Sequence, residues 1–130
     1  MNTIDAIDLF TKERLEKIFP ADRADNFFEA LYGDASEGAY DISLEFSKIE
    51  NGSLIFEFHL KQRPGKCLAC NLTYGLPTVF SRHPVINLDG ITKEINVLLD
   101  GKATCTGWEV KHTKEVNRSL HLLPVAFPIT

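Results

Sequence analysis

Residues 41–61, DISLEFSKIENGSLIFEFHLK, decide the fold that the sequence predicts. Apolar side chains alternate with polar ones on both sides of Asn51-Gly52. A period of two is typical of strands that bury one face, and Asn-Gly favours a tight turn between such strands. The stretch therefore predicts an antiparallel β-hairpin.

The apolar face of this hairpin fixes its register. A two-residue loop at Asn51-Gly52 would place Phe46 opposite Glu57, whereas a three-residue loop, Glu50-Asn51-Gly52, places Phe46 opposite Phe56. Because a slip of one residue turns every side chain to the other face, we predict the three-residue loop, with Gly52 in the left-handed conformation and a bulge at the turn. The other expected pairs are Leu44 with Phe58, Ile42 with Leu60, Ser43 with His59 and Glu45 with Glu57.

Three short helical segments are predicted before the hairpin. Residues 3–10 give weak helical turns, and Thr11 is placed to cap a second short helix. Residues 24–31 carry apolar side chains at helical spacing, which predicts a third helix that Gly33 terminates. These side chains favour a position in the core over a groove for a partner.

The pattern changes again after the hairpin. Arg63-Pro64-Gly65 predicts a turn, and Cys67–Tyr74 predicts a third strand. Residues 75–84 are predicted to be irregular, because a glycine and a proline interrupt the alternation. A helix is then predicted from Leu88 to Leu99.

The C-terminal part predicts two more strands. One is expected at residues 108–112, a turn or bulge at residues 114–118, and a last strand from Leu120. Pro124 is expected to interrupt this last strand, and the apolar tail VAFPIT after it is expected to pack as an edge or to cover the core, since its proline cannot donate to a neighbouring strand. The order α-β-β-β-α-β-β predicts one α+β domain over residues 1–130. Its two layers would be an antiparallel meander sheet and a cover of N-terminal helices and one internal helix.

Composition narrows the classes of function. The 130 residues are 44% hydrophobic and 25% charged, with a formal charge of −4, as in ordinary globular proteins. No basic cluster suits nucleic acid, and no apolar run suits a membrane span. The acidic start MNTIDAIDLF is unlike a signal peptide, and three cysteines fit reduced thiols. We therefore expect a cytoplasmic protein that binds neither membrane nor nucleic acid.

The motif Cys67-Leu68-Ala69-Cys70 leaves three interpretations open. With His83 and Cys105 it would supply the ligands of a Cys₃His zinc site. It would instead act in thiol redox chemistry if Arg63 and Lys66 lowered a thiolate pKa. The favoured interpretation is packing, because cysteines three apart on a strand point to opposite faces and only one such pair exists.

Two polar groups are further candidates for a site. Asn71, Tyr74, Arg82 and His83 form a weakly basic cluster that would bind an anion or a partner's carboxylate, with residues 74–83 as its wall. The predicted Glu45–Glu57 pair would suit acid–base chemistry or a cation, or would be a solvated strand face.

Three motifs carry a resemblance to a known family. They are EGAYDI at Glu37–Ile42, RPGKCLACNLTYGLPTVFSRHPVIN at residues 63–87, and GWEVKHTKEV at Gly107–Val116. The chain resembles a family of small uncharacterised bacterial proteins, a resemblance that implies no activity. Its order of elements is also similar to that of bacterial secretion chaperones, which is a likeness of fold alone.

These patterns favour a non-enzymatic domain that binds a protein partner or itself. The apolar C-terminal tail VAFPIT and the edge strands favour a homodimer. The alternative is a metal-binding or thiol-based small enzyme centred on Cys67, Cys70 and His83, with zinc as its metal.

Overall fold

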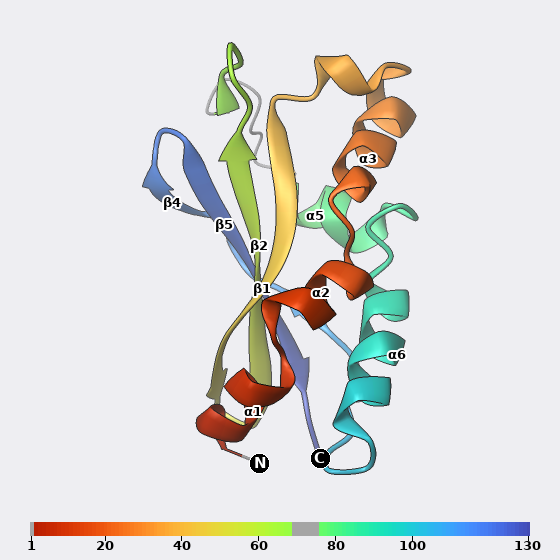
Figure 1. Cartoon of the computed structure of the whole chain (residues 1–130), viewed down its shortest axis with the longest axis vertical. Coiled ribbons are helices and arrows are strands. Elements are labelled where there is room, and N and C mark those ends of the chain that lie inside the picture. Colours follow the sequence, from red (N-terminus) through yellow and green to blue (C-terminus); the bar gives the residue numbers. More distant parts are fainter. Residues whose placement is uncertain (1, 69–75) are drawn as a thin grey trace.

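The structure is a computed structural model that describes residues 2–68 and 76–130 (Figure 1). It confirms the α+β fold with an antiparallel sheet. The strands are hydrogen-bonded in the order β1-β2-β5-β3, and β4 also pairs with β5. The elements are α1 (Thr3–Leu9), α2 (Lys12–Ile18), α3 (Asp22–Tyr32), η1 (Ala35–Glu37), β1 (Tyr40–Glu50), β2 (Ser53–Gln62), α5 (Leu76–Arg82), α6 (Leu88–Leu99), β3 (Glu109–Val110), β4 (Lys114–Asn117) and β5 (Leu120–Pro128).

The register predicted for the β1–β2 hairpin is confirmed. Phe46 lies opposite Phe56, and the other four predicted pairs are also present. The predicted three-residue loop is wrong, because Glu50 pairs with Ser53 across a two-residue Asn51-Gly52 turn. Both turn residues have positive φ, 50° and 74°, which is the conformation that Asn-Gly favours.

A bulge in β1 reconciles the short turn with the predicted register. Phe46 and Lys48 face the consecutive residues Phe56 and Ile55, so Ser47 is an extra residue in β1. The bulge returns Ile49 to the face of Phe46, where Ile49 packs against the core. The signal was present in the sequence, since the apolar positions of β1 step by two up to Phe46 and then by three to Ile49.

The segment after β2 differs from the prediction. The turn at Arg63-Pro64-Gly65 is confirmed, with Lys66 N donating to Arg63 O and Gly65 at φ 74°. Leu68 is helical, so no third strand begins at Cys67, and residues 69–75 lie outside the described part. Helix α5 occupies much of the segment that was predicted to be irregular. Its Pro77 stands in the first helical turn, which proline tolerates, so it begins the helix instead of interrupting one.

The three N-terminal helices and α6 match their predictions. The Thr11 side chain accepts from Arg14 N at the start of α2, and Gly33 ends α3 in the left-handed conformation. Helix α6 has the predicted bounds, and Asn87 caps it by accepting from Gly90 N.

The last strand is central and runs through Pro124 to Pro128, so the predicted interruption at Pro124 and the predicted edge position of the tail are both wrong. Strand β5 pairs with β2 along its whole length and with β3 and β4 on its other side. The Pro124 carbonyl accepts from Lys111 N, so its ring nitrogen also points to that second side. Proline has no N–H to donate there, and β3 ends at Val110 while β4 begins at Lys114. Strand β4 occupies residues that were predicted as a turn.

The described helices pack on one face of the sheet, as Figure 1 shows. Their aromatic contacts identify this face: Phe10 of the α1 C-cap packs on Phe56, and Phe80 of α5 packs on Phe58. In β2 and β5 the side chains of this inner face are buried and alternate with those of the opposite face. Those of β2 are Leu54, Phe56, Phe58 and Leu60, and those of β5 include Leu123, Val125 and Phe127.

Candidate protein-interaction face

The opposite face of the sheet, which we call the outer face, is the best candidate for a site. Its residues follow from the register, and they are Ser43, Glu45 and Lys48 of β1, Ile55, Glu57, His59 and Lys61 of β2, Leu120, Leu122, Pro124 and Ala126 of β5, Glu109 and Lys111 at β3, and Lys114 of β4. In the described ranges helices reach only the margins of this face: α2 lines a pocket with Ser43, Glu45 and Lys61, and α5 lines a hollow with Glu109.

Strand β5 is apolar on its outer face as well as on its inner face. Leu120, Leu122, Pro124 and Ala126 follow one another on the outer side, and the strand contains no Asp, Glu, Lys or Arg. A strand of an antiparallel sheet with one solvated face normally alternates apolar and polar residues, whereas a strand covered on both faces is apolar throughout. The composition of β5 is therefore that of a strand with both faces covered.

Charged side chains lie beside this apolar strand, on the neighbouring strand β2 and at both edges of the sheet. The Glu57 and His59 side chains are 20% and 24% exposed, and His59 Nε2 lies 3.9 Å from Glu57 Oε1. At the edges, Lys48 Nζ lies 3.2 Å from Glu50 Oε2, and Lys111 Nζ lies 3.2 Å from Glu109 Oε2. The charges at the edges correspond to the polar rim of a protein interface, whereas Glu57 and His59 lie in the central part of this face.

The predicted Glu45–Glu57 and Ser43–His59 pairs are both present on this face. Within residues 2–68 and 76–130, no three His, Cys, Asp or Glu side chains are placed to hold a metal ion. Ser43 Oγ is buried and has no hydrogen-bond partner among the described groups. A buried hydroxyl is shielded from substrate, so this geometry supports a packing role for Ser43.

The residues predicted as zinc ligands are not gathered in the described part of the chain. Cys67 is disulfide-bonded, contrary to the expected reduced thiols, and Cys70 lies outside the described residues. The argument that Cys67 and Cys70 would point to opposite faces of a strand does not apply, since Leu68 is helical. Cys105 is buried beside α6, where its N and O bond to the Asn96 side chain.

His83 has structural contacts at the end of α5. Its Nδ1 accepts from Val85 N at 3.2 Å, and its ring lies 4.8 Å from that of Phe27. Burial lowers the pKa of His83, which favours the neutral imidazole that can accept this bond. Neighbouring Arg82 is exposed, whereas Asn71 and Tyr74 of the predicted binding cluster lie outside the described residues.

A shallow hollow of about 280 Å³ adjoins this segment. Pro77, Thr78 and Ser81 of α5 line one side of it, and residues 108–110 line the other. Trp108 is oriented by its Nε1, which donates to Asp89 Oδ1 at 2.8 Å. The hollow lies beside the residues that we predicted would wall a site, but its lining has no charged group except Glu109.

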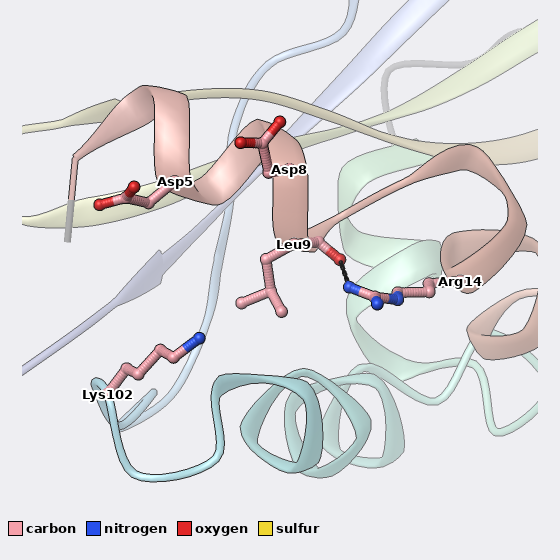
Figure 2. A pocket seen from close by; sticks show the side chains of 5 residues that line it. All are labelled: Asp5, Asp8, Leu9, Arg14 and Lys102. Atoms are coloured by element: carbon pink, nitrogen blue, oxygen red, sulfur yellow. Dashed lines mark hydrogen bonds between the residues drawn. The ribbon is translucent and has the colours of Figure 1, made fainter.

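A larger pocket, which the sequence did not predict, lies between α1 and the turn after α6 (Figure 2). Its volume is about 560 Å³, and its lining residues are Asp5, Asp8, Leu9, Arg14 and Lys102. Arg14 Nη1 donates to Leu9 O at 2.8 Å, so this cation is already engaged (Figure 2). Figure 2 shows the Asp5 and Asp8 carboxylates pointing in different directions, so the charged groups do not converge on one ligand.

The pH dependence of stability tests whether the Cys105 thiol is buried. Burial raises the pKa of the Cys105 thiol from its ordinary value of 9.0 to about 11. As the pH rises, the unfolded chain therefore releases this proton before the folded chain does. The stability that the protonated thiol gives the folded chain is complete below pH 9 and is lost by about pH 11. Over this pH interval we expect the free energy of unfolding of Cys105→Ala to fall by roughly 2 kcal/mol less than that of the wild type.

Urea unfolding at pH 8 and pH 11 measures this difference. Burial also raises the pKa of Tyr40, which destabilises both proteins at high pH and cancels in the comparison. Equal losses in the two proteins would show that the thiol is accessible in the folded state.

Comparison of the chain with known protein families, curated proteins and solved structures found no match. Among the described helices, none has the length and apolar character needed to cross a membrane. The residues themselves thus define the class: an α+β domain with an open antiparallel sheet whose outer face is apolar along its central strand. Sequence reasoning missed this face, although the run HLLPVAF at residues 121–127 is apolar at both odd and even positions.

Proposed function

We propose that this chain is a non-enzymatic domain that binds a folded protein surface through its outer face. The observation that carries the proposal is the composition of β5, which is apolar on both faces while the described helices cover only one. Burial of apolar surface is the main driving force of protein association. Pro124 and Ala126 are already buried among their neighbours, whereas Leu120 and Leu122, towards the start of β5, are partly exposed, and they are the side chains that a partner would cover.

The charged rim of the outer face supports the same function. Rim charges contribute to orientation and to the rate of association more than to affinity, and they keep the free protein soluble. The alternative, a metal-binding or thiol-based enzyme at Cys67, Cys70 and His83, has less support, because His83 bonds to Val85 and Cys105 lies beside α6. The cytoplasmic location is part of the proposal, but the disulfide of Cys67 removes the support that reduced thiols would give it, and counting the free thiols of the native protein tests this point.

Site-specific photo-crosslinking tests the proposal. A photoreactive amino acid at position 122 is expected to form a covalent adduct with a protein in the cells that express the chain. The control position is Val97, which is 72% exposed on α6 and therefore lies in the layer that covers the inner face. Adducts from position 122 that are missing from position 97 support the proposal.

The mass of the adduct also informs on the partner. An adduct of twice the 14.6 kDa chain identifies a second copy, and any other discrete mass identifies a different protein. If position 122 gives no more adduct than position 97, the outer face is not an interaction surface and the proposal is wrong.

A further inference from the structure

We infer that the partner of the outer face is a second copy of this chain, packed face to face about a two-fold axis. The inference rests on the proposed function and adds the identity of the partner. Its basis is the arrangement of charges at the two edges of the outer face, which is complementary to itself.

The register places five charged residues in two rows that run across the sheet, and four of the five stand at the ends of these rows. In the first row Glu45 of β1 pairs with Glu57, Glu57 pairs with Pro124, and Pro124 O accepts from Lys111 N. Glu45 and Lys111 therefore mark the two ends of this row, with opposite charges.

The neighbouring row has the reverse order of charges. Lys48 pairs with Ile55, Ile55 with Ala126, and Ala126 with Glu109. A cation thus stands at the β1 end of this row and an anion at its β3 end. Each edge of the outer face presents one acid and one base in adjacent rows, and the two edges present them in opposite order.

A two-fold axis brings opposite charges together in either of its two natural orientations. An axis parallel to β2 and β5 exchanges the edges within a row, so that Glu45 of one copy faces Lys111 of the second and Lys48 faces Glu109. An axis perpendicular to the strands exchanges the rows within an edge, so that Glu45 faces Lys48 and Lys111 faces Glu109. Both keep the two sheets aligned, as packed sheets prefer, and both are isologous.

The size of the outer face fits this partner. Four strand positions about 4.8 Å apart and about 30 Å long give a projected area of roughly 600 Å². A stable interface buries about 800 Å² of accessible surface on each partner, and side chains make the accessible surface larger than its projection. The outer face of one copy is therefore large enough to form a stable interface with the outer face of another.

Mass measurement on the purified full chain tests the inference. Light scattering or sedimentation equilibrium is expected to give a mass of twice 14.6 kDa at micromolar concentration. Leu122→Asp places a charge on the apolar outer side of β5 and is expected to raise the dissociation constant at least 100-fold, whereas Val97→Asp on α6 leaves it unchanged.

Charge reversal then tests the face-to-face arrangement. Glu45→Lys, Lys48→Glu and Lys111→Glu each bring like charges together twice in a homodimer, and each is expected to weaken it at least tenfold. A mixture of the Glu45→Lys and Lys111→Glu proteins regains wild-type affinity if the axis is parallel to the strands. A mixture of the Glu45→Lys and Lys48→Glu proteins regains it if the axis is perpendicular.

The outcomes separate the two proposals. Recovery in either mixture establishes the second copy and selects the axis. A monomeric wild type, or a dimer that neither Leu122→Asp nor the reversals weaken, overturns the second copy as partner. If position 122 still crosslinks to a different protein in cells, the proposed function stands and only this inference fails.

Discussion

Replacing Arg63 with alanine is expected to lower the free energy of unfolding by about 3 kcal/mol, because this side chain links three elements to the end of β2. Its Nη2 lies 2.8 Å from Asp25 Oδ1 of α3, its Nε lies 3.0 Å from Asp41 Oδ1 of β1, and its Nη1 donates to Ala35 O of η1. The guanidinium also lies 5.3 Å from the centre of the Phe28 ring. The arginine side chain is only 17% exposed, so water does not replace these contacts while the protein is folded.

Two further variants separate the causes of this loss. Arg63→Lys keeps the charge but cannot make the three directional contacts, so it is expected to lose at least half as much stability as alanine. Arg82→Ala removes an exposed arginine from the end of α5 and is expected to change stability by less than about 0.5 kcal/mol. Urea unfolding measures all three variants. A loss below 1 kcal/mol for Arg63→Ala would show that the exposed carboxylates contribute little, as in most surface ion pairs.

The sequence predicted local features of this chain well and long-range features poorly. Caps such as Thr11 and the helical period of α6 depend on residues within a few positions, and both were confirmed. The central position of β5 depends on strands that lie about 60 residues apart in the sequence, β2 and β5. No local pattern encodes such a pairing, so the general rule for proline placed an interruption at Pro124 and the tail after it at an edge.

The outer face could be predicted only in part. The alternation in β1 and β2 placed Glu45, Glu57 and His59 on a common face, as found. Whether that face is solvated or covered depends on β5, whose apolar outer residues join it only through the non-local β2–β5 pairing. The predicted cluster around the cysteines rested instead on spacing along one segment, and spacing does not bring His83 and Cys105 together.

The β1–β2 register was predicted correctly for an incomplete reason. The apolar pattern required Phe46 to face Phe56, and one extra residue was needed to reach that register from an Asn-Gly turn. We placed the extra residue in the loop, whereas the chain places it at Ser47. The apolar pattern fixes the register, in which Phe46 faces Phe56. The turn that Asn-Gly prefers then decides whether the extra residue lies in the loop or in the strand.

Two single-residue deletions in β1 are therefore expected to have opposite results. Without Ser47, Lys48 still faces Ile55 and Phe46 still faces Phe56, because only the unpaired residue of the bulge is removed. We expect this deletion to change the free energy of unfolding by less than about 1 kcal/mol, since each β1 side chain keeps its face. Near-UV circular dichroism should match that of the wild type, and urea unfolding should remain cooperative.

Removing Ser43 instead should abolish the native fold. The deletion shifts the first part of β1 by one residue, and Tyr40 and Ile42, which are 3% and 2% exposed, turn towards the outer face. Losing the burial of two such side chains costs about 3 to 6 kcal/mol, a large share of the 5 to 15 kcal/mol that typically stabilises a domain. Both deletions remove a partly buried serine from the same strand, so composition cannot explain a difference between them. A folded Ser43 deletion, or an unfolded Ser47 deletion, would show that strand register does not control this sheet.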